Sequence, residues 1–261
     1  MRLELNKTHC MDNRKGMNLL PNNFIDLTVT SPPYDDLRSY KGCEWNFEIF
    51  KEVANELYRV TKEGGVVVWI VNDKTIKGSE TGTSFKQALY FKEIGFNIHD
   101  TMIYLKNNPT PCKSNRYQPS FEYMFVLSKG KPKTFNPILE DKKYKENRKE
   151  KWYNKTTNGV QTKAKVSQCE KKLKSNVWLY SVGKHHSTKD TIAFKHPAIF
   201  PEQMAEDHIL SWSNEGDIVM DIFSGSGTTR KVCIKNNRNF IGFEIAQEYV
   251  EIEEERIKNV V

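Results

Sequence analysis

The chain has 261 residues, a formal net charge of +7 and a sequence pI of about 9, with 38% hydrophobic and 28% charged residues. This composition supports a folded core and excludes wholesale disorder, and the length fits one large domain or one domain with an insertion. The longest apolar run, Val66 to Val71, is too short to span a bilayer, and the N-terminus lacks an apolar secretion signal. We therefore expect neither a membrane nor a secreted protein.

The chain before residue 131 alternates β-branched apolar runs with apolar residues at helical spacing. The predicted elements are strands at 24–30, 66–71, 99–106 and 122–128 and helices at 47–60 and 84–94. Lys62-Glu-Gly-Gly predicts a turn after the first helix, and Gly95 closes the second. The last two strands are expected to pair across a long proline-containing loop.

The sequence Thr30-Ser-Pro-Pro-Tyr34 follows the first predicted strand, at the sheet edge where open α/β proteins bind ligands. The prolines leave the Pro32 carbonyl as a rigid acceptor, while Ser31 adds a hydroxyl and Tyr34 an aromatic face. Such a set suits an extruded planar base that carries an exocyclic NH2 group. The alternative is a polar turn that only ends a strand.

Residues 131–189 contain 16 Lys+Arg and 5 Asp+Glu, a local charge of +11 that leaves −4 for the rest of the chain. Aromatic residues are interleaved with these charges: Tyr144, Trp152, Tyr153, Trp178 and Tyr180. This pattern favours nucleic-acid binding over a merely solvated loop. Candidate contacts to DNA are Asn147, Arg148, Asn154, Asn158 and Gln161, with Asn107, Asn108, Lys113 and Arg116 in the preceding loop.

Strands and helices also alternate after residue 190. The predicted elements are helices at 201–212, 228–236 and 247–258 and strands at 217–223 and 240–245. This alternation predicts an α/β fold with a doubly wound, mostly parallel sheet.

A glycine-rich turn, Phe223-Ser-Gly-Ser-Gly-Thr-Thr229, joins one of these strands to a helix. Gly225 and Gly227 allow close backbone approach to a ligand, and the helix N-terminus offers free N–H groups. The turn is neither a P-loop nor a full G-x-G-x-x-G motif. Glu244 ends the following strand, where a carboxylate accepts ribose hydroxyls in nucleotide sites. An ordinary strand-to-helix turn with an exposed Glu is the alternative.

The cysteines are widely spaced and include no C-x-x-C pair, which argues against a disulfide framework and a zinc site: Cys10, Cys43, Cys112, Cys169 and Cys233. His185 and His186 are adjacent and point apart, so no metal is predicted. A reducing, cytoplasmic setting is expected.

The two motifs together, at residues 30–34 and 221–229, resemble the permuted, β-group DNA amino-methyltransferases. In that group the catalytic motif precedes the cofactor motif and a basic segment lies between them. Its members move a methyl group from S-adenosylmethionine to N4 of cytosine or N6 of adenine. The resemblance implies a Rossmann-like methyltransferase fold with a catalytic half at 1–130, a target-recognition region at 131–189 and a cofactor-binding half at 190–261.

The resemblance also implies site residues. It assigns catalysis to Ser31, Pro32, Pro33 and Tyr34. It assigns cofactor binding to Asp12, His196, Pro197, Asp221, Phe223, Gly225, Ser226, Gly227, Thr228, Thr229 and Glu244, with Glu244 on the ribose. Asp12 could instead be a helix cap and His196 a surface histidine. Asn72-Asp73 either lines the base pocket or forms a turn.

The chain departs from the usual pattern at Ile222, where most members have Pro, and at Ser31, where Asp accompanies N6-adenine targets. Ser at this position favours N4 of cytosine, with direct methyl transfer and no cysteine nucleophile. The implied partner is double-stranded DNA, with a homodimer and a separately acting restriction endonuclease as further expectations. The alternatives are an N6-adenine enzyme, a non-catalytic DNA-binding module, and a methyltransferase acting on RNA or protein glutamine.

Overall fold

The computed structural model describes residues 3–34, 45–109, 111–112, 115–142, 153–155, 161–163, 170–184 and 186–258, without the side chains of 153–155 and 161–163. The chain forms two compact units. The first comprises Met1–Asn136 and Asn176–Val261, and the second comprises Pro137–Ser175.

The first unit is built on an eight-stranded sheet. Its strands are β1 (Lys7–Cys10), β2 (Ile25–Thr30), β3 (Thr61–Val71), β6 (Asn97–Lys106), β7 (Phe121–Ser128), β12 (Val177–Tyr180), β13 (Ile218–Asp221) and β14 (Asn239–Glu244). Their order in space is β1-β14-β13-β2-β3-β7-β6-β12. Strand β7 pairs antiparallel with β3 and β6, and every other pair is parallel. The predicted mostly parallel sheet and the predicted pairing of β6 with β7 are confirmed.

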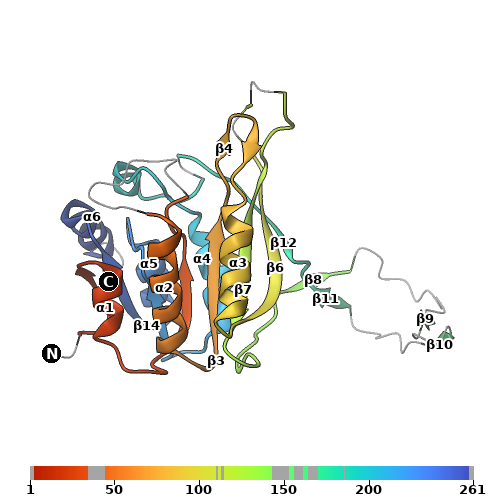
Figure 1. Cartoon of the computed structure of the whole chain (residues 1–261), viewed down its shortest axis with the longest axis horizontal. Coiled ribbons are helices and arrows are strands. Elements are labelled where there is room, and N and C mark those ends of the chain that lie inside the picture. Colours follow the sequence, from red (N-terminus) through yellow and green to blue (C-terminus); the bar gives the residue numbers. More distant parts are fainter. Residues whose placement is uncertain are drawn as a thin grey trace. The chain divides into compact units, whose positions relative to one another are not determined.

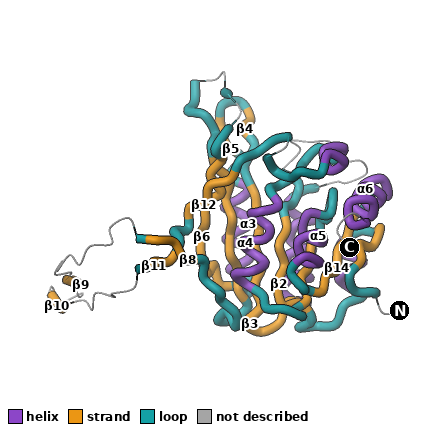
Figure 2. Tube along the Cα trace, turned by 180° about the vertical axis from the view of Figure 1, so that it is seen from behind, coloured by secondary structure: helices purple, strands orange, loops and turns teal. Residues whose placement is uncertain are grey.

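Helices cover both faces of this sheet (Figures 1 and 2). They are α1 (Asn13–Asn18), α2 (Phe47–Val60), α3 (Thr83–Glu93), α4 (Glu202–Trp212), α5 (Thr228–Lys235) and α6 (Gln247–Lys258), with a short 3-10 helix at Thr191–Lys195. Helices α1 to α3 lie on one face and α4 to α6 on the other. The doubly wound α/β architecture is therefore confirmed.

Strand β3 shows why both faces need helices. Its residues Val66 to Val71 are all buried, because successive side chains point to opposite sides of the sheet. Val67, Trp69 and Val71 join the core cluster that includes Phe50 of α2 and Phe91 of α3. The remaining three point to the opposite face.

The expected turn at residues 62–65 is wrong, because these residues lie within β3. Pairing with β2 passes from Ile25–Thr61 to Leu27–Val66 across an irregularity. The two glycines bond to the backbone beside β7: Gly64 N donates to Lys129 O at 2.7 Å, and Lys129 N donates to Gly65 O at 3.1 Å. Strand pairing thus overrides the turn preference of the glycines. The sequence also gave no signal for β1, α1 or the hairpin of β4 (Thr75–Ile76) and β5 (Ser79–Glu80).

The second unit contains two short antiparallel pairs: β8 (Leu139–Asp141) with β11 (Lys171–Leu173), and β9 (Tyr153–Lys155) with β10 (Gln161–Lys163). It is narrower than the basic segment predicted at 131–189. Trp178 and Tyr180 of β12 are buried in the first unit, and Tyr180 Oη donates to Asp207 Oδ2 at 2.6 Å. These two aromatic residues therefore serve packing of the sheet and not a surface tract.

Several residues singled out from the sequence lie outside the described residues: Cys43, Lys113, Tyr144, Asn147, Arg148, Trp152, Asn158, Cys169 and His185. The side chains of Tyr153, Asn154 and Gln161 are likewise not described.

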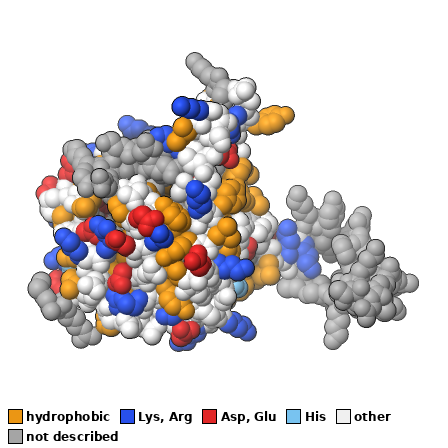
Figure 3. Space-filling model, viewed as in Figure 1, with side chains coloured by type: hydrophobic (Ala, Val, Ile, Leu, Met, Phe, Trp, Pro, Cys, Tyr) orange, Lys and Arg blue, Asp and Glu red, His pale blue; other side chains and the backbone are white. Residues whose placement is uncertain are grey.

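Acidic and basic side chains are intermingled over the face formed by α1 to α3 (Figure 3). This mixture agrees with the small net charge of the chain outside its basic segment. Within the described ranges, no helix combines the length and the apolar character needed to cross a bilayer.

The aromatic cluster beneath α3 generates a stability prediction. The ring of Phe91 lies 5.1 Å from that of Phe50 and 5.2 Å from that of Trp69, and its side chain is fully buried. We expect Phe91→Ala to lower the free energy of unfolding by about 3–5 kcal/mol, since it removes buried area and leaves a cavity. Leu89→Ala on the same helix, where the residue is 65% exposed, should cost less than about 1 kcal/mol. Urea denaturation of both variants checks this, and equal losses would contradict the described core.

Candidate functional site

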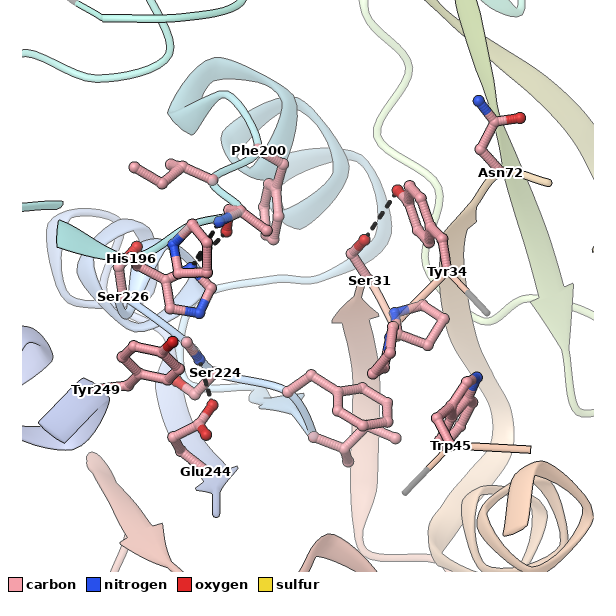
Figure 4. Close-up of a pocket in the computed structure, with 18 of the residues that line it drawn as sticks. Ser31, Tyr34, Trp45, Asn72, His196, Phe200, Ser224, Ser226, Glu244 and Tyr249 are labelled. Carbon is pink, nitrogen blue, oxygen red and sulfur yellow. Dashed lines mark hydrogen bonds between the residues drawn. The ribbon is translucent and has the colours of Figure 1, made fainter. Parts of the chain in front are cut away.

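A cleft of about 1490 Å³ opens at the carboxyl ends of β2 and β13. At this point the order of the sheet reverses, because β2 leads through α2 to β3 on one side and β13 leads through α5 to β14 on the other. Open α/β sheets bind ligands at such a switch point. Both sequence motifs line the cleft, and Figure 4 shows Ser31 and Tyr34 on one side with Ser226, Glu244 and His196 on the other.

The Ser-Pro-Pro-Tyr turn leaves β2 and enters the cleft directly. All four residues line it, with Pro32 and Pro33 buried and Ser31 and Tyr34 half-buried. The hydroxyls of Ser31 and Tyr34 are 3.0 Å apart, and Tyr34 Oη donates to Glu122 Oε2 at 2.7 Å. The turn therefore presents a hydroxyl, a rigid carbonyl and an aromatic ring to one space.

The glycine-rich turn forms the other wall. Phe223, Gly225, Ser226 and Thr228 line the cleft, and so does the adjoining Ser224. Gly225 has φ of +52°, and a Cβ there would lie 3.0 Å from His196 Nε2. A larger residue would therefore be strained in its backbone and would push on the imidazole.

Glu244 ends β14 beside this turn and also lines the cleft. Its Oε2 accepts the Gly225 N–H at 2.9 Å, and its Oε1 accepts the Ala246 N–H at 2.9 Å. Burial raises the pKa of the Glu244 carboxyl, although these backbone N–H groups oppose the shift. Each oxygen keeps further acceptor capacity for ligand hydroxyls.

Asp221 does not line the cleft, although it was predicted at the cofactor site. It is fully buried beneath the two turns, where Oδ1 accepts the Thr30 hydroxyl and Oδ2 accepts the Thr229 hydroxyl, both at 2.7 Å. Oδ1 also accepts the Phe223 N–H at 3.1 Å. Burial raises the pKa of this carboxyl, against the effect of its three donors. The residue thus joins the catalytic turn to the glycine-rich turn from below.

Gly227 and Thr229 lie in the same layer, outside the cleft wall. Gly227 precedes α5 with φ of +77°, and a Cβ there would lie 2.2 Å from the side chain of Glu253. Both its backbone conformation and this contact require glycine.

The remaining predicted cofactor residues line the opposite end of the cleft: Asp12, His196 and Pro197. Asp12 is also the cap of α1, accepting the Arg14 N–H at 2.8 Å, and hydrogen bonds from the Arg14 side chain lower its pKa. The His196 ring packs edge-on against Tyr249, with ring centroids 4.3 Å apart. Capping and cleft lining are therefore compatible at Asp12, and His196 is buried.

Asn72 and Asp73 line the cleft at the end of β3. Asp73 also accepts the Ser84 N–H at 2.9 Å, and thus caps α3, whose own cap residue Gly82 has no side chain. The turn and the pocket interpretations therefore hold together for this pair.

A buried ionic network under the glycine-rich turn was missed in the sequence. Arg256 of α6, with a fully buried side chain, donates to Ser226 O and pairs with Glu202 at 2.7 Å and Asp190 at 3.2 Å. Lys231 of α5 pairs with the same two acids, at 2.8 Å and 2.6 Å. Burial alone would raise the pKa of Asp190, but its two cationic partners outweigh this and lower it. The one available signal was the i, i+3 spacing of Glu253 and Arg256 on α6.

Further cleft residues also went unnoticed in the sequence: Trp45, Tyr104, Lys106, Glu122, Phe200, Ile245 and Tyr249. They come from elements distant in the chain, and none belongs to a motif. Among the described residues, no group of three His, Cys, Asp or Glu side chains is placed to hold a metal ion.

A family model described as DNA methylase, for N6- and N4-methyltransferases, matches residues 25–255 of the chain. The orphan methyltransferase M.BamHII of Bacillus amyloliquefaciens is 59% identical over 248 residues, which cover 91% of this chain and 90% of that protein.

Two solved structures share the fold. The PvuII DNA methyltransferase, described as cytosine-N4-specific, superposes with a TM-score of 0.73 at 19% identity, covering 99% of this chain and 92% of that one. TTHA0409 of Thermus thermophilus, a DNA modification methylase solved with S-adenosyl-L-methionine, gives a TM-score of 0.66 at 21% identity, covering 98% and 94%.

The buried acid below the glycine-rich turn predicts a pH-dependent stability. Burial raises the pKa of Glu253 to about 7, although Thr8 and Ser224 donate to it and Arg230 lies 3.4 Å away. Because the pKa is higher in the folded state than in the unfolded state, the stability due to this group is largest at acid pH. It is lost as the pH rises through about 7, by roughly 3 kcal/mol.

We expect Glu253→Gln to remove this part of the pH dependence, so that its Tm falls less than that of the wild type between about pH 5 and pH 8. Glu254→Gln is the matched control, because Glu254 also pairs with Arg230 but its side chain is 42% exposed. Thermal unfolding over the pH range measures both. Identical slopes for Glu253→Gln and the wild type would contradict the assignment.

Proposed function

The chain belongs to the DNA methylase family of N6- and N4-methyltransferases, and we propose that it transfers a methyl group from S-adenosylmethionine to the exocyclic amine of an extruded base in double-stranded DNA, preferably N4 of cytosine. The single observation that carries this proposal is the meeting of the Ser-Pro-Pro-Tyr turn and the glycine-rich turn in one cleft. Buried Asp221, bonded to Thr30 and Thr229, holds the two turns side by side.

The glycine-rich side fits a sulfonium nucleoside. The half-buried Glu244 carboxylate would accept the two ribose hydroxyls, and the apolar side chains of Phe223 and Ile245 line the cleft where an adenine ring needs them. Gly225 leaves room for close approach of the methionine portion, beside His196. When bound, S-adenosylmethionine supplies an electrophilic methyl group on a positively charged sulfur.

The Ser-Pro-Pro-Tyr side fits the target base. Ser31 Oγ and the Pro32 carbonyl would accept the two N–H groups of the exocyclic amine, and Tyr34 would stack on the ring. These hydrogen bonds draw the amine towards sp³ geometry and expose its nitrogen lone pair. With base and methyl donor held in one cleft, orientation supplies much of the rate. The structure offers both walls without a protein nucleophile.

Ser31 is the basis for preferring cytosine N4 over adenine N6. An acidic residue at this position accompanies N6-adenine targets in the family that the sequence resembles. The cytosine-N4-specific description of the PvuII enzyme agrees with this preference. The second unit, Pro137–Ser175, and the basic residues around it would bind the phosphates and read the recognition sequence. The homodimer, the paired endonuclease and the cytoplasmic setting stay predictions.

The decisive test is expression in a bacterial host that lacks DNA methylation. We expect its DNA to acquire one modified nucleoside, N4-methylcytosine, which nucleoside mass spectrometry distinguishes from N6-methyladenine and 5-methylcytosine. N6-methyladenine would overturn the base preference alone. Unmodified DNA, with no binding of S-adenosylmethionine in calorimetry, would indicate a non-catalytic module and contradict the proposed function.

Two substitutions should separate chemistry from cofactor binding. Ser31→Ala is expected to lower kcat by about 100-fold, because it removes an acceptor for the amine, and to leave the Kd for S-adenosylmethionine within about twofold. Glu244→Ala is expected to raise that Kd by about tenfold or more, because the ribose loses a charged acceptor. Isothermal titration and single-turnover methylation measure the two effects, and the reverse assignment of losses would contradict the described walls.

A further inference from the structure

A charged pair lies directly behind the catalytic tyrosine. Glu122 of β7 accepts the Tyr34 hydroxyl on Oε2 at 2.7 Å, and its Oε1 pairs with Lys106 Nζ at 2.6 Å. Lys106 belongs to β6, which pairs with β7, so the sheet fixes the spacing of the two side chains. Both residues line the cleft, and neither belongs to the sequence motifs.

This arrangement decides which way the hydrogen bonds of the turn run. A phenol has one proton, and a carboxylate can only accept, so the proton of Tyr34 is committed to Glu122. In the 3.0 Å contact between the hydroxyls of Ser31 and Tyr34, Ser31 must therefore be the donor. Tyr34 is the only hydrogen-bond partner of the Ser31 side chain among the described residues. With its single proton used there, Ser31 Oγ turns its lone pairs to the cleft.

The direction matters for the reaction. An amine about to be methylated must keep its nitrogen lone pair free to form the N–CH3 bond as the S–CH3 bond breaks. A serine that donated its proton to this nitrogen would occupy the lone pair. A serine that only accepts holds an N–H group and leaves the lone pair for the methyl group.

We propose that Glu122, held by Lys106, is a positioning residue that sets Ser31 as a hydrogen-bond acceptor for the target amine. The proposal rests on the proposed function and adds a specific role to a residue outside the motifs. The pair is suited to it because the side chains of Lys106 and Glu122 are only 21% and 14% exposed, so solvent screens their attraction less than in a surface pair. The ring of Tyr104 lies beside Lys106, with the ammonium 5.9 Å from its centroid.

The test compares Glu122→Gln with the wild type on unmethylated genomic DNA and tritiated S-adenosylmethionine. A glutamine amide can donate to the phenol, which frees the Tyr34 proton to point at Ser31. We expect kcat to fall by about 10- to 100-fold, with KM for DNA and Kd for S-adenosylmethionine within about threefold. Glu56→Gln is the matched control, because Glu56 is 24% exposed and pairs with Arg59 at 2.6 Å on α2. Its kcat should stay at the wild-type value.

A double-mutant cycle separates this role from a merely structural one. Tyr34→Phe removes the hydroxyl through which Glu122 acts, so Glu122→Gln should have little further effect on kcat in that background. A wild-type kcat for Glu122→Gln, or the same loss of kcat with and without the Tyr34 hydroxyl, would overturn the proposal.

If Glu122→Gln does not fold, as judged by thermal unfolding, Glu122→Asp takes its place in the same cycle. It keeps the carboxylate, and its kcat should exceed that of Tyr34→Phe by several-fold. A folded Glu122→Asp variant no more active than Tyr34→Phe would overturn the proposal. A wild-type protein that methylates no DNA would instead fail the proposed function itself, and the positioning role with it.

Discussion

The cleft depends on one buried carboxylate. Asp221 accepts hydroxyl protons from Thr30, the last residue before the catalytic turn, and from Thr229, in the first turn of α5. The two segments are almost 200 residues apart in the chain, as the separation of 191 between Thr30 and Asp221 shows. A buried acid without donors would be costly, whereas one with three donors fixes the geometry of all of them. The relative position of the two cleft walls is therefore set from inside the protein before any ligand arrives.

The glycine-rich turn is stabilised by polar contacts rather than by apolar packing alone. Arg256 holds the Ser226 carbonyl, Glu253 accepts the Ser224 hydroxyl, and Glu244 accepts the Gly225 N–H. Removing one partner from such a network leaves a buried charge without compensation. On the other wall, Glu122 and Lys106 hold the hydroxyl of Tyr34. Both walls thus have charged groups behind them that orient the groups facing the cleft.

The sequence was sufficient to predict the sheet class, most strands, and the two turns that line the cleft, because these depend on local patterns of β-branched residues, glycine and proline. The role of Asp221 was misplaced, since a motif gives the position of a residue but not the direction of its side chain. Arg256 and Glu122 could not be found, because a buried charged residue is indistinguishable from an exposed one until its distant partners are known. The strand β12 was hidden inside a basic segment, where its alternation of exposed and buried residues covers only four positions.

The second unit is inserted between two strands of the main sheet, after β7 and before β12, and each junction is anchored in the first unit. Asn136 donates from its side chain to Leu210 O at 3.1 Å, and Asn176 donates to Asp100 Oδ1 at 3.1 Å while its carbonyl accepts the Ile103 N–H at 2.8 Å. Neither anchor touches the cleft. A different segment joined at these two asparagines would inherit an intact cleft, so the architecture permits recognition to diversify by exchange of one cassette while the chemistry is inherited unchanged.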